Sequence, residues 1–308
     1  MDTAALLDPA IASALEAIPF PTISTETLPF MRDFEFPRPA LSDAVTRTDV
    51  EVSSDPRIVV RIHRPKGASG PMPCFFSIHG GGYVLGSYDM DDVRMDRWCQ
   101  QFSCVGVSVE YRLAPETPYP GPLEDCYTAL RWTHDNAQSL DIDRTRIGIG
   151  GISAGGGLSA ALALLARDRG ELPVRFQLLE CPMLDDRQSS PSSQLDGLAI
   201  WTRESNTFGW SSYLGELSGR DDIPAYAAPA RATDLAGLPP TFIAVGTVDG
   251  FRDEDIAYAT RLNQANVPTE LHVYPGLPHG HALFQGVAAV AQWERDVEDW
   301  VARQFARD

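Results

Sequence analysis

One serine of the chain has neighbours suited to a nucleophile. Ser153 lies in the segment GISAG (151–155), after an apolar run at 146–151 and before an Ala- and Leu-rich stretch at 154–169. A G-x-S-x-G segment between a strand and a helix is a nucleophile elbow, because small neighbours permit the strained serine backbone and the helix N-terminus favours developing negative charge. The pattern therefore predicts that Ser153 attacks an acyl carbonyl. The alternative is a glycine-rich strand–helix turn with an ordinary serine.

A second glycine-rich segment, HGGG (79–82), directly follows another apolar run. Three successive glycines let backbone N–H groups converge on one point, as acyl transfer requires around the oxyanion of its tetrahedral intermediate. We expect the N–H groups of Gly80, Gly81 and Ala154 to form this oxyanion hole. A phosphate-binding loop is the alternative, but no G-x-x-x-x-G-K-[ST] segment is present and the single lysine is misplaced for one.

A serine nucleophile needs a general base, and the chain has six histidines. His63 and His272 are predicted inside strands, and His134 on a solvated helix face. His79 is predicted to support the glycine loop. The order Ser, acid, His places the base near the C-terminus, so it is His279 or His281. This H-x-H pair could instead bind a metal, but no carboxylate or thiol close in sequence completes such a site.

The acid that orients the base should follow the apolar run at 241–245. Asp249 is the acidic residue closest to the end of this run, where a loop can reach the histidine. The later candidates Asp253, Glu254 and Asp255 begin the next helical segment, where acids simply suit the helix dipole. We therefore predict Asp249 as the third member of the site.

These residues need a scaffold, and short apolar runs alternate with helical segments through most of the chain. The predicted strands are 45–52, 57–64, 73–78, 104–111, 146–151, 176–181, 241–245 and 269–274, and the predicted helices of the alternating part are 122–138, 154–169, 253–266 and 285–305. Such alternation implies parallel crossovers. We predict an α/β fold with an eight-stranded, mostly parallel sheet flanked by helices, whose first strand pair forms an antiparallel edge.

Two stretches interrupt the alternation. Residues 1–44 contain a predicted helix near 8–17, and residues 185–228 are rich in Ser, Gly, Trp and Tyr. Long insertions in a compact fold are usually functional lids or disordered loops, and the aromatic residues of the second stretch favour a folded lid. We expect the two stretches to form a helical cap over a core made of 45–184 and 229–308. Large side chains of the cap and of the core beneath it are predicted to contact the substrate: Tyr83, Ile152, Trp201, Phe208 and Trp210.

Composition excludes several classes of partner. The formal net charge of −17 over 308 residues makes nucleic acid or an anionic membrane a poor partner. No apolar run of about 18 residues predicts a membrane span, and the first 20 residues lack the basic region of a signal peptide. The five cysteines are odd in number and have no C-x-x-C spacing. These features favour a reduced, cytoplasmic protein.

Taken together, the motifs resemble the hormone-sensitive-lipase-like group of α/β-hydrolases, the bacterial family IV esterases. The matching segments are HGGGY (79–83), EYRLAPE (110–116), GISAGG (151–156), DGFRDE (249–254) and HGH (279–281), and the resemblance covers about residues 55–300. It implies the α/β-hydrolase fold and a triad of Ser153, Asp249 and His279. The chain departs from the group at Ile152, where an acidic residue is common, and at His281, which replaces an aromatic residue.

The resemblance implies a carboxylic ester hydrolase, and within the group the chain is most similar to acetylesterases. A small-molecule ester is then the partner, with no metal and no organic cofactor. The cap aromatics favour short acyl groups, from acetyl to hexanoyl. The alternative is that these aromatics only hold the cap together. The group also implies a homodimer through the last strand, 269–274, whose edge is otherwise unpaired. The alternatives are an amidase or peptidase on the same scaffold and a non-catalytic ligand receptor of that fold.

Overall fold

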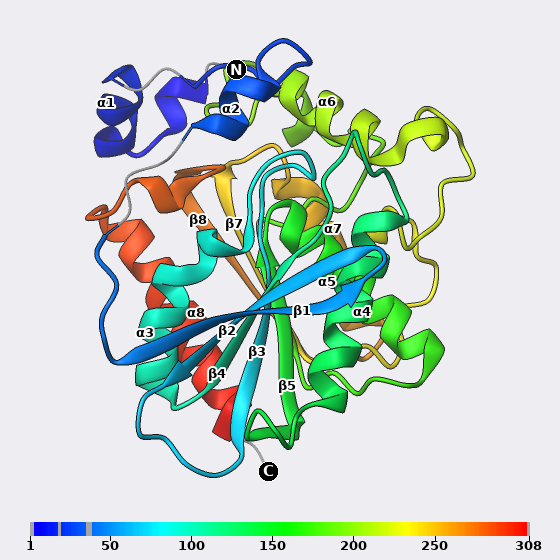
Figure 1. Ribbon diagram of the computed structural model, residues 1–308. Helices are drawn as coiled ribbons and strands as arrows, with labels where there is room; N and C mark the ends of the chain where they lie inside the picture. The colour runs from blue at the N-terminus through cyan, green and yellow to red at the C-terminus, as the bar shows by residue number, and fades with distance from the viewer. Residues whose placement is uncertain (1–2, 18–19, 35–38, 307–308) are drawn as a thin grey trace.

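The computed structural model describes residues 3–17, 20–34 and 39–306, and a single eight-stranded sheet runs through its centre (Figure 1). The strands lie in the order β1-β2-β4-β3-β5-β6-β7-β8. Their bounds are Val45–Ser54 (β1), Arg57–Pro65 (β2), Met72–Ile78 (β3), Val105–Glu110 (β4), Ile142–Ile152 (β5), Gln177–Glu180 (β6), Thr241–Val248 (β7) and Thr269–Pro278 (β8). β2 pairs antiparallel with β1 and β4, and all other neighbours are parallel.

The strands follow the apolar runs of the sequence. Every residue of β3 is buried, and all but one residue of β4 is buried. This is the pattern of central strands covered on both faces, whose sequences are continuous apolar runs. β1 alternates between buried, half-buried and exposed residues because it lies at the edge of the sheet. The predicted eight-stranded α/β-hydrolase sheet with its antiparallel edge is confirmed.

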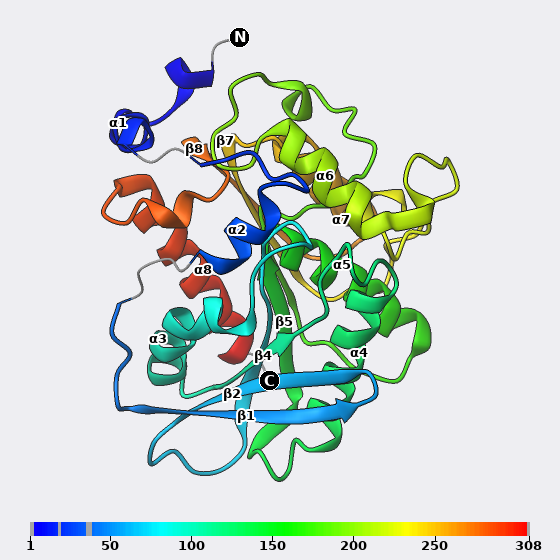
Figure 2. The same cartoon turned by 45° about the horizontal axis from the view of Figure 1, so that its top comes forward.

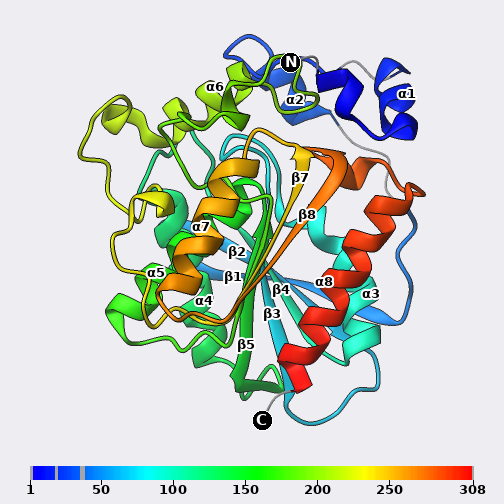
Figure 3. The same cartoon turned by 180° about the vertical axis from the view of Figure 1, so that it is seen from behind.

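Helices cover both faces of the sheet. One face carries α3 (Asp92–Phe102) and α8 (Ala288–Ala306), and the other carries α4 (Gly121–Asp135), α5 (Ala154–Arg169) and α7 (Arg252–Gln264), as Figures 1 and 3 show from opposite sides. Each face encloses its own apolar cluster. The helix α3 was not predicted because its sequence, DVRMDRWCQQF, is mostly polar. Only Asp92, Met95, Trp98 and Cys99, which are three or four residues apart on one face of the helix, are buried.

The prediction that His134 lies on a solvated face of its helix is wrong. His134 is only 2% exposed, because α4 packs against α5 as well as against β1 and β2 and therefore buries a wide face. Neither ring nitrogen has a hydrogen-bond partner among the described residues. Burial lowers the pKa of His134 to about 4, with the positive charge of Arg144 adding to the effect. His134 is therefore a neutral packing residue.

The N-terminal segment and the segment after β6 contact each other above the carboxyl ends of the strands. Helices α1 (Pro9–Ala17), α2 (Leu28–Asp33) and α6 (Arg203–Leu214) gather there, with α2 and α6 side by side in Figures 1 and 2. The Thr3 hydroxyl donates to the carbonyl oxygens of Asp196 and Gly197, at 2.9 and 2.8 Å. The Ile23 N–H donates to the Ser205 hydroxyl at 2.9 Å. These hydrogen bonds join the two segments into one cap over the carboxyl ends of the strands.

Within the described residues, no helix combines the length and apolar character needed to cross a bilayer.

Candidate active site

Ser153 occupies a sharp turn between β5 and α5. Its backbone angles are φ 58° and ψ −121°, a conformation that side-chain-bearing residues rarely adopt. The turn packs directly against the end of β3, since a Cβ atom on Gly151 or Gly155 would come within 2.3 or 1.9 Å of the Ile78 carbonyl oxygen. The Ser153 N–H donates to the Glu180 carbonyl oxygen at 2.8 Å. The glycines of the GISAG segment therefore have the close-packing role that the elbow requires.

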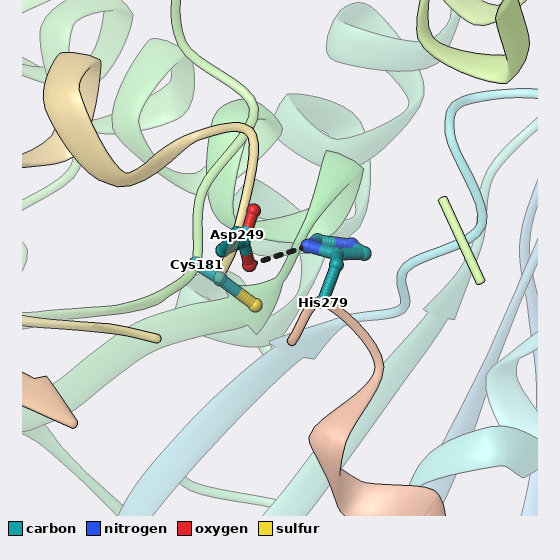
Figure 4. A group of neighbouring side chains, drawn as sticks. All are labelled: Cys181, Asp249 and His279. Carbon is teal, nitrogen blue, oxygen red and sulfur yellow. Dashed lines mark hydrogen bonds and ion pairs between the residues drawn. The ribbon is translucent and has the colours of Figure 1, made fainter. Parts of the chain in front are cut away.

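Two loops at the same end of the sheet bring an acid and a base to this serine. The Nε2 atom of His279 lies 2.9 Å from the Ser153 hydroxyl oxygen, and its Nδ1 atom lies 2.8 Å from the Asp249 Oδ2 atom. Asp249 follows β7 and His279 follows β8, and Figure 4 shows their side chains meeting. All three residues are less than 10% exposed. With Nδ1–H donated to the carboxylate, Nε2 is left as the acceptor for the serine proton.

The carboxylate of Asp249 is itself oriented by the backbone. Its Oδ1 atom accepts a hydrogen bond from the Phe251 N–H at 2.9 Å, while Oδ2 faces the histidine. The ring of Phe251 also packs edge-on against the His279 ring, with centroids 5.0 Å apart. The loop after β7 therefore positions both the acid and the imidazole.

The competing candidates have other contacts. His281 packs on the Trp293 ring, with centroids 3.8 Å apart, and burial lowers its pKa to about 3. Asp253 accepts a hydrogen bond from the Ser192 N–H at 2.7 Å, and Glu254 accepts one from the Leu184 N–H at 2.9 Å. Among the described residues, the Ser153 hydroxyl has no hydrogen bond to His281, Asp253 or Glu254.

The carboxyl of Asp255, in the first turn of α7, is buried close enough to Asp249 to feel its charge. Asp255 is fully buried, and neither of its oxygens has a hydrogen-bond partner among the described residues. Burial raises the pKa of Asp255 well above its usual value, and the carboxyls of Glu254 and Asp249 add to the effect. Its neutral form is therefore favoured beside the charged part of the site.

The HGGG loop runs beside the elbow. A Cβ atom on Gly80 would lie 2.9 Å from the Ile152 carbonyl oxygen and 3.5 Å from the Ser153 Cβ atom, so the two backbones are in direct contact. Gly81 has φ +114°, which only glycine adopts readily. The first residue of α5, Ala154, follows Ser153 directly. The structure thus places the Gly80 backbone against the turn that holds Ser153, with Gly81 next in the loop and Ala154 next after the serine.

His79 supports this loop. Its ring stacks on Tyr111 with centroids 4.1 Å apart, and its Nδ1 atom lies 2.8 Å from the Gly80 carbonyl oxygen, to which it can only donate. The Tyr111 hydroxyl donates to the His79 carbonyl oxygen at 3.0 Å. Burial lowers the pKa of His79 to about 4, so the ring is neutral near pH 7. Tyr111 belongs to the segment EYRLAPE, for which residue chemistry alone suggested no role.

The five predicted substrate contacts divide into two groups. The Trp201 ring lies over Gly82, where a Cβ atom would come within 2.0 Å of it, and its centroid is 6.4 Å from that of His279. Ile152 packs its side chain against Gly80. By contrast, Tyr83 and Trp210 are almost wholly buried and pack on each other at 5.4 Å. Phe208, on α6, is half-buried within the cap packing.

A buried charge beneath the elbow was not predicted from the sequence. Glu180, at the end of β6, is 1% exposed and forms an ion pair with Arg94. Its Oε2 atom also accepts a hydrogen bond from the Trp293 indole N–H at 2.8 Å. The Glu180 carbonyl oxygen is the group that accepts from Ser153 N–H. These partners come from three distant segments, so no local sequence signal could have grouped them.

The thiol of Cys181 lies close to Asp249 and His279. One donor atom each of Cys181, Asp249 and His279 lies within 4.8 Å of the other two, and all three side chains are buried (Figure 4). This is the group of described residues that could hold a metal ion.

The fold and this hydrogen-bonded site define the class of α/β-hydrolases. The α/β-hydrolase fold family matches residues 75–283. Esterase LipI of Mycobacterium tuberculosis is 34% identical over 301 residues, which cover 92% of this chain and 91% of that protein. Carboxylesterase NlhH of the same species is 38% identical over 237 residues, covering 76% and 74%.

The solved structures that resemble this chain are also esterases. Bacterial heroin esterase superposes with a TM-score of 0.91 and 38% identity, covering 99% of this chain and all of the other. Esterase LipW from Mycobacterium marinum superposes with a TM-score of 0.88 and 31% identity, covering 99% and 98%. The chain belongs to the hormone-sensitive-lipase-like family of α/β-hydrolases. It is a carboxylic ester hydrolase.

Proposed function

We propose that the protein is a serine carboxylesterase that hydrolyses short-chain acyl esters through an acyl-enzyme. One observation carries the proposal: an unbroken chain of hydrogen bonds runs from Asp249 through His279 to Ser153, at 2.8 and 2.9 Å. A serine hydroxyl is a weak nucleophile until an adjacent base takes its proton, and this arrangement supplies that base already oriented.

The proposed cycle has two halves. The Ser153 oxygen attacks the ester carbonyl while His279 Nε2 takes the hydroxyl proton, and Asp249 stabilises the imidazolium. The N–H groups of Gly80, Gly81 and Ala154 receive the oxyanion. His279 then gives its proton to the leaving alcohol. Water attacks the acyl-enzyme by the same route and releases the acid, so that neither a metal nor an organic cofactor takes part.

We expect Asp249→Asn to lower kcat on p-nitrophenyl acetate by about 10⁴, because an amide at this position favours the wrong tautomer of the base. The measurement is steady-state kinetics on purified protein. Asp253→Asn is the matched control: its carboxylate caps the Ser192 N–H and pairs with Arg252, so its loss should affect stability more than turnover. If Asp253→Asn were the more damaging change, the acid would belong to the following helix.

The acyl preference is expected to depend on Trp201. Its ring lies over Gly82 of the HGGG loop, with its centroid 6.4 Å from that of His279, and we expect the acyl chain of a bound ester to contact it there. Each buried methylene gains about 0.8 kcal/mol until the pocket is filled, so rates should rise with chain length and then fall. We expect the optimum between acetyl and hexanoyl esters. A wild-type enzyme that hydrolyses palmitoyl esters faster than butyryl esters would contradict this expectation.

Replacement of Trp201 should open the pocket. We expect Trp201→Ala to raise the ratio of kcat/KM for octanoyl over butyryl p-nitrophenyl esters at least tenfold, since two or more additional methylenes can then be buried. Trp210→Ala is the matched control: Trp210 is 2% exposed and packs on Tyr83, so its removal should destabilise the fold by about 3–5 kcal/mol and leave the ratio unchanged. An unchanged ratio in Trp201→Ala would exclude this ring as the pocket wall.

We also propose a homodimer through β8. The strand lies at the edge of the sheet, pairs with β7 on one side, and leaves Val273 37% exposed. An isologous pairing of two such edges would close the assembly with two-fold symmetry. We expect light scattering at micromolar concentration to give twice the mass of one chain, and Val273→Arg to give a monomer. A wild-type monomer would refute the proposal.

A further inference from the structure

The structure assigns a second, inhibitory role to the back of the active site: we propose that Cys181, Asp249 and His279 together bind a thiophilic divalent cation such as Zn²⁺ and that this binding stops catalysis. The inference rests on the proposed function of His279 as general base. It concerns a ligand that the reaction itself does not use.

The donor set and its geometry suit zinc. Thiolate sulfur, imidazole nitrogen and carboxylate oxygen are the three ligand types that zinc sites combine, and zinc binds them at about 2.0–2.3 Å, which places the donors of a tetrahedral site about 3.3–3.7 Å apart. Here the three donor atoms lie within 4.8 Å of one another. Asp249 Oδ2 and His279 Nδ1, which are 2.8 Å apart, must separate by about 0.5 Å to admit the metal. Any donor pair near the 4.8 Å limit must approach by about 1 Å.

The three ligands come from the ends of three neighbouring strands. Cys181 directly follows β6, Asp249 follows β7, and His279 follows β8, and Figure 4 shows their side chains converging. Cys181 is fully buried, and the His279 side chain is slightly exposed, so a cation from solvent meets the site first at His279. The formal charge of −17 raises the local concentration of cations around the chain.

Binding at this position disables the base. Asp249 faces the Nδ1 atom of His279, so the metal bonds Nδ1 and displaces its proton. The imidazole remains neutral by carrying its proton on Nε2, which then donates to Ser153 instead of accepting from it. The thiol of Cys181 becomes a thiolate, and its proton goes to solvent, so one proton is released for each metal bound.

Burial and the charge of Asp249 raise the pKa of the Cys181 thiol well above its usual value. Without metal, Cys181 is therefore a neutral packing group beside the triad, and it competes neither for the serine proton nor for the substrate. The metal supplies the positive charge that makes its thiolate form stable.

The test compares zinc inhibition in matched variants. Protein dialysed against EDTA should retain its esterase activity, because no resident metal takes part. Added Zn²⁺ should then inhibit the wild type, and EDTA should restore the rate. In Cys181→Ala, with inhibition measured against that variant's own metal-free rate, the half-inhibitory Zn²⁺ concentration should rise at least about tenfold. Cys126→Ala, which removes another fully buried thiol from α4, should keep the wild-type value.

A binding measurement separates this proposal from the catalytic one. Cd²⁺ added to Ser153→Ala should produce the ultraviolet absorption of a cadmium–thiolate bond, and Ser153→Ala/Cys181→Ala should not. Should Cys181→Ala fail to fold, Cys181→Ser takes its place in both arms. Equal zinc sensitivity of the wild type and the Cys181 variant, or an absence of cadmium–thiolate absorption, would overturn the proposal. An active Ser153→Ala that still binds Cd²⁺ through Cys181 would instead overturn the proposed function alone.

Discussion

Ser153→Ala is expected to lower kcat on p-nitrophenyl acetate by a factor on the order of 10⁵–10⁶, because the proposed covalent intermediate can no longer form. The change removes only the hydroxyl oxygen, and alanine can take the same backbone conformation as Ser153, whose φ is 58°. The fold should persist, since the Ser153 N–H keeps its hydrogen bond to Glu180. Circular dichroism and thermal melting report on the fold, and steady-state rates report on turnover.

Ser108→Ala is the matched control for this variant. Ser108 is fully buried in β4, and its hydroxyl has no hydrogen-bond partner among the described residues. Its removal should leave both turnover and melting temperature near the wild-type values. A folded Ser153→Ala enzyme with near wild-type turnover would show that Ser153 is not the nucleophile.

His279→Ala is expected to have a similarly large effect, on the order of 10⁵ in kcat, since members of such a triad act as a unit. His281→Ala should lower kcat by less than about tenfold and cost about 2 kcal/mol of unfolding free energy, because its neutral ring packs on Trp293 rather than on the serine. The two variants should be compared by kcat and by chemical denaturation. The reverse ranking in kcat would move the base from position 279 to 281.

The residues of the site were predictable because each lies next to a local signal. The elbow, the HGGG loop and the two loops after β7 and β8 each follow an apolar run, and parallel strands bring their carboxyl ends to one edge of the sheet. The choice between His279 and His281 was different. Residue chemistry left both open. The tertiary structure separates them, because His279 bonds to Ser153 and Asp249 whereas His281 packs on Trp293.

The features that were missed depend on contacts between distant segments. α3 is mostly polar, so its few buried side chains gave no clear helical period. His134 was predicted to be solvated because its burial depends on the packing of α4 on α5, β1 and β2, which the sequence of α4 alone does not show. The partners of Glu180 and the proximity of Cys181 to the triad likewise arise only when β6 is placed between β5 and β7. Local pattern cannot report such neighbours.

The central claim is that Ser153 carries the acyl group during turnover, and covalent labelling tests it most directly. The enzyme should be treated with a p-nitrophenyl phosphonate ester, an electrophile that leaves a stable adduct on an activated serine. Intact-mass and peptide mass spectrometry then count and locate the adduct. We predict one adduct per chain, on Ser153, formed in step with the loss of esterase activity and absent from His279→Ala. Full inactivation with the adduct on any other residue, or full labelling of Ser153 with activity retained, would contradict it.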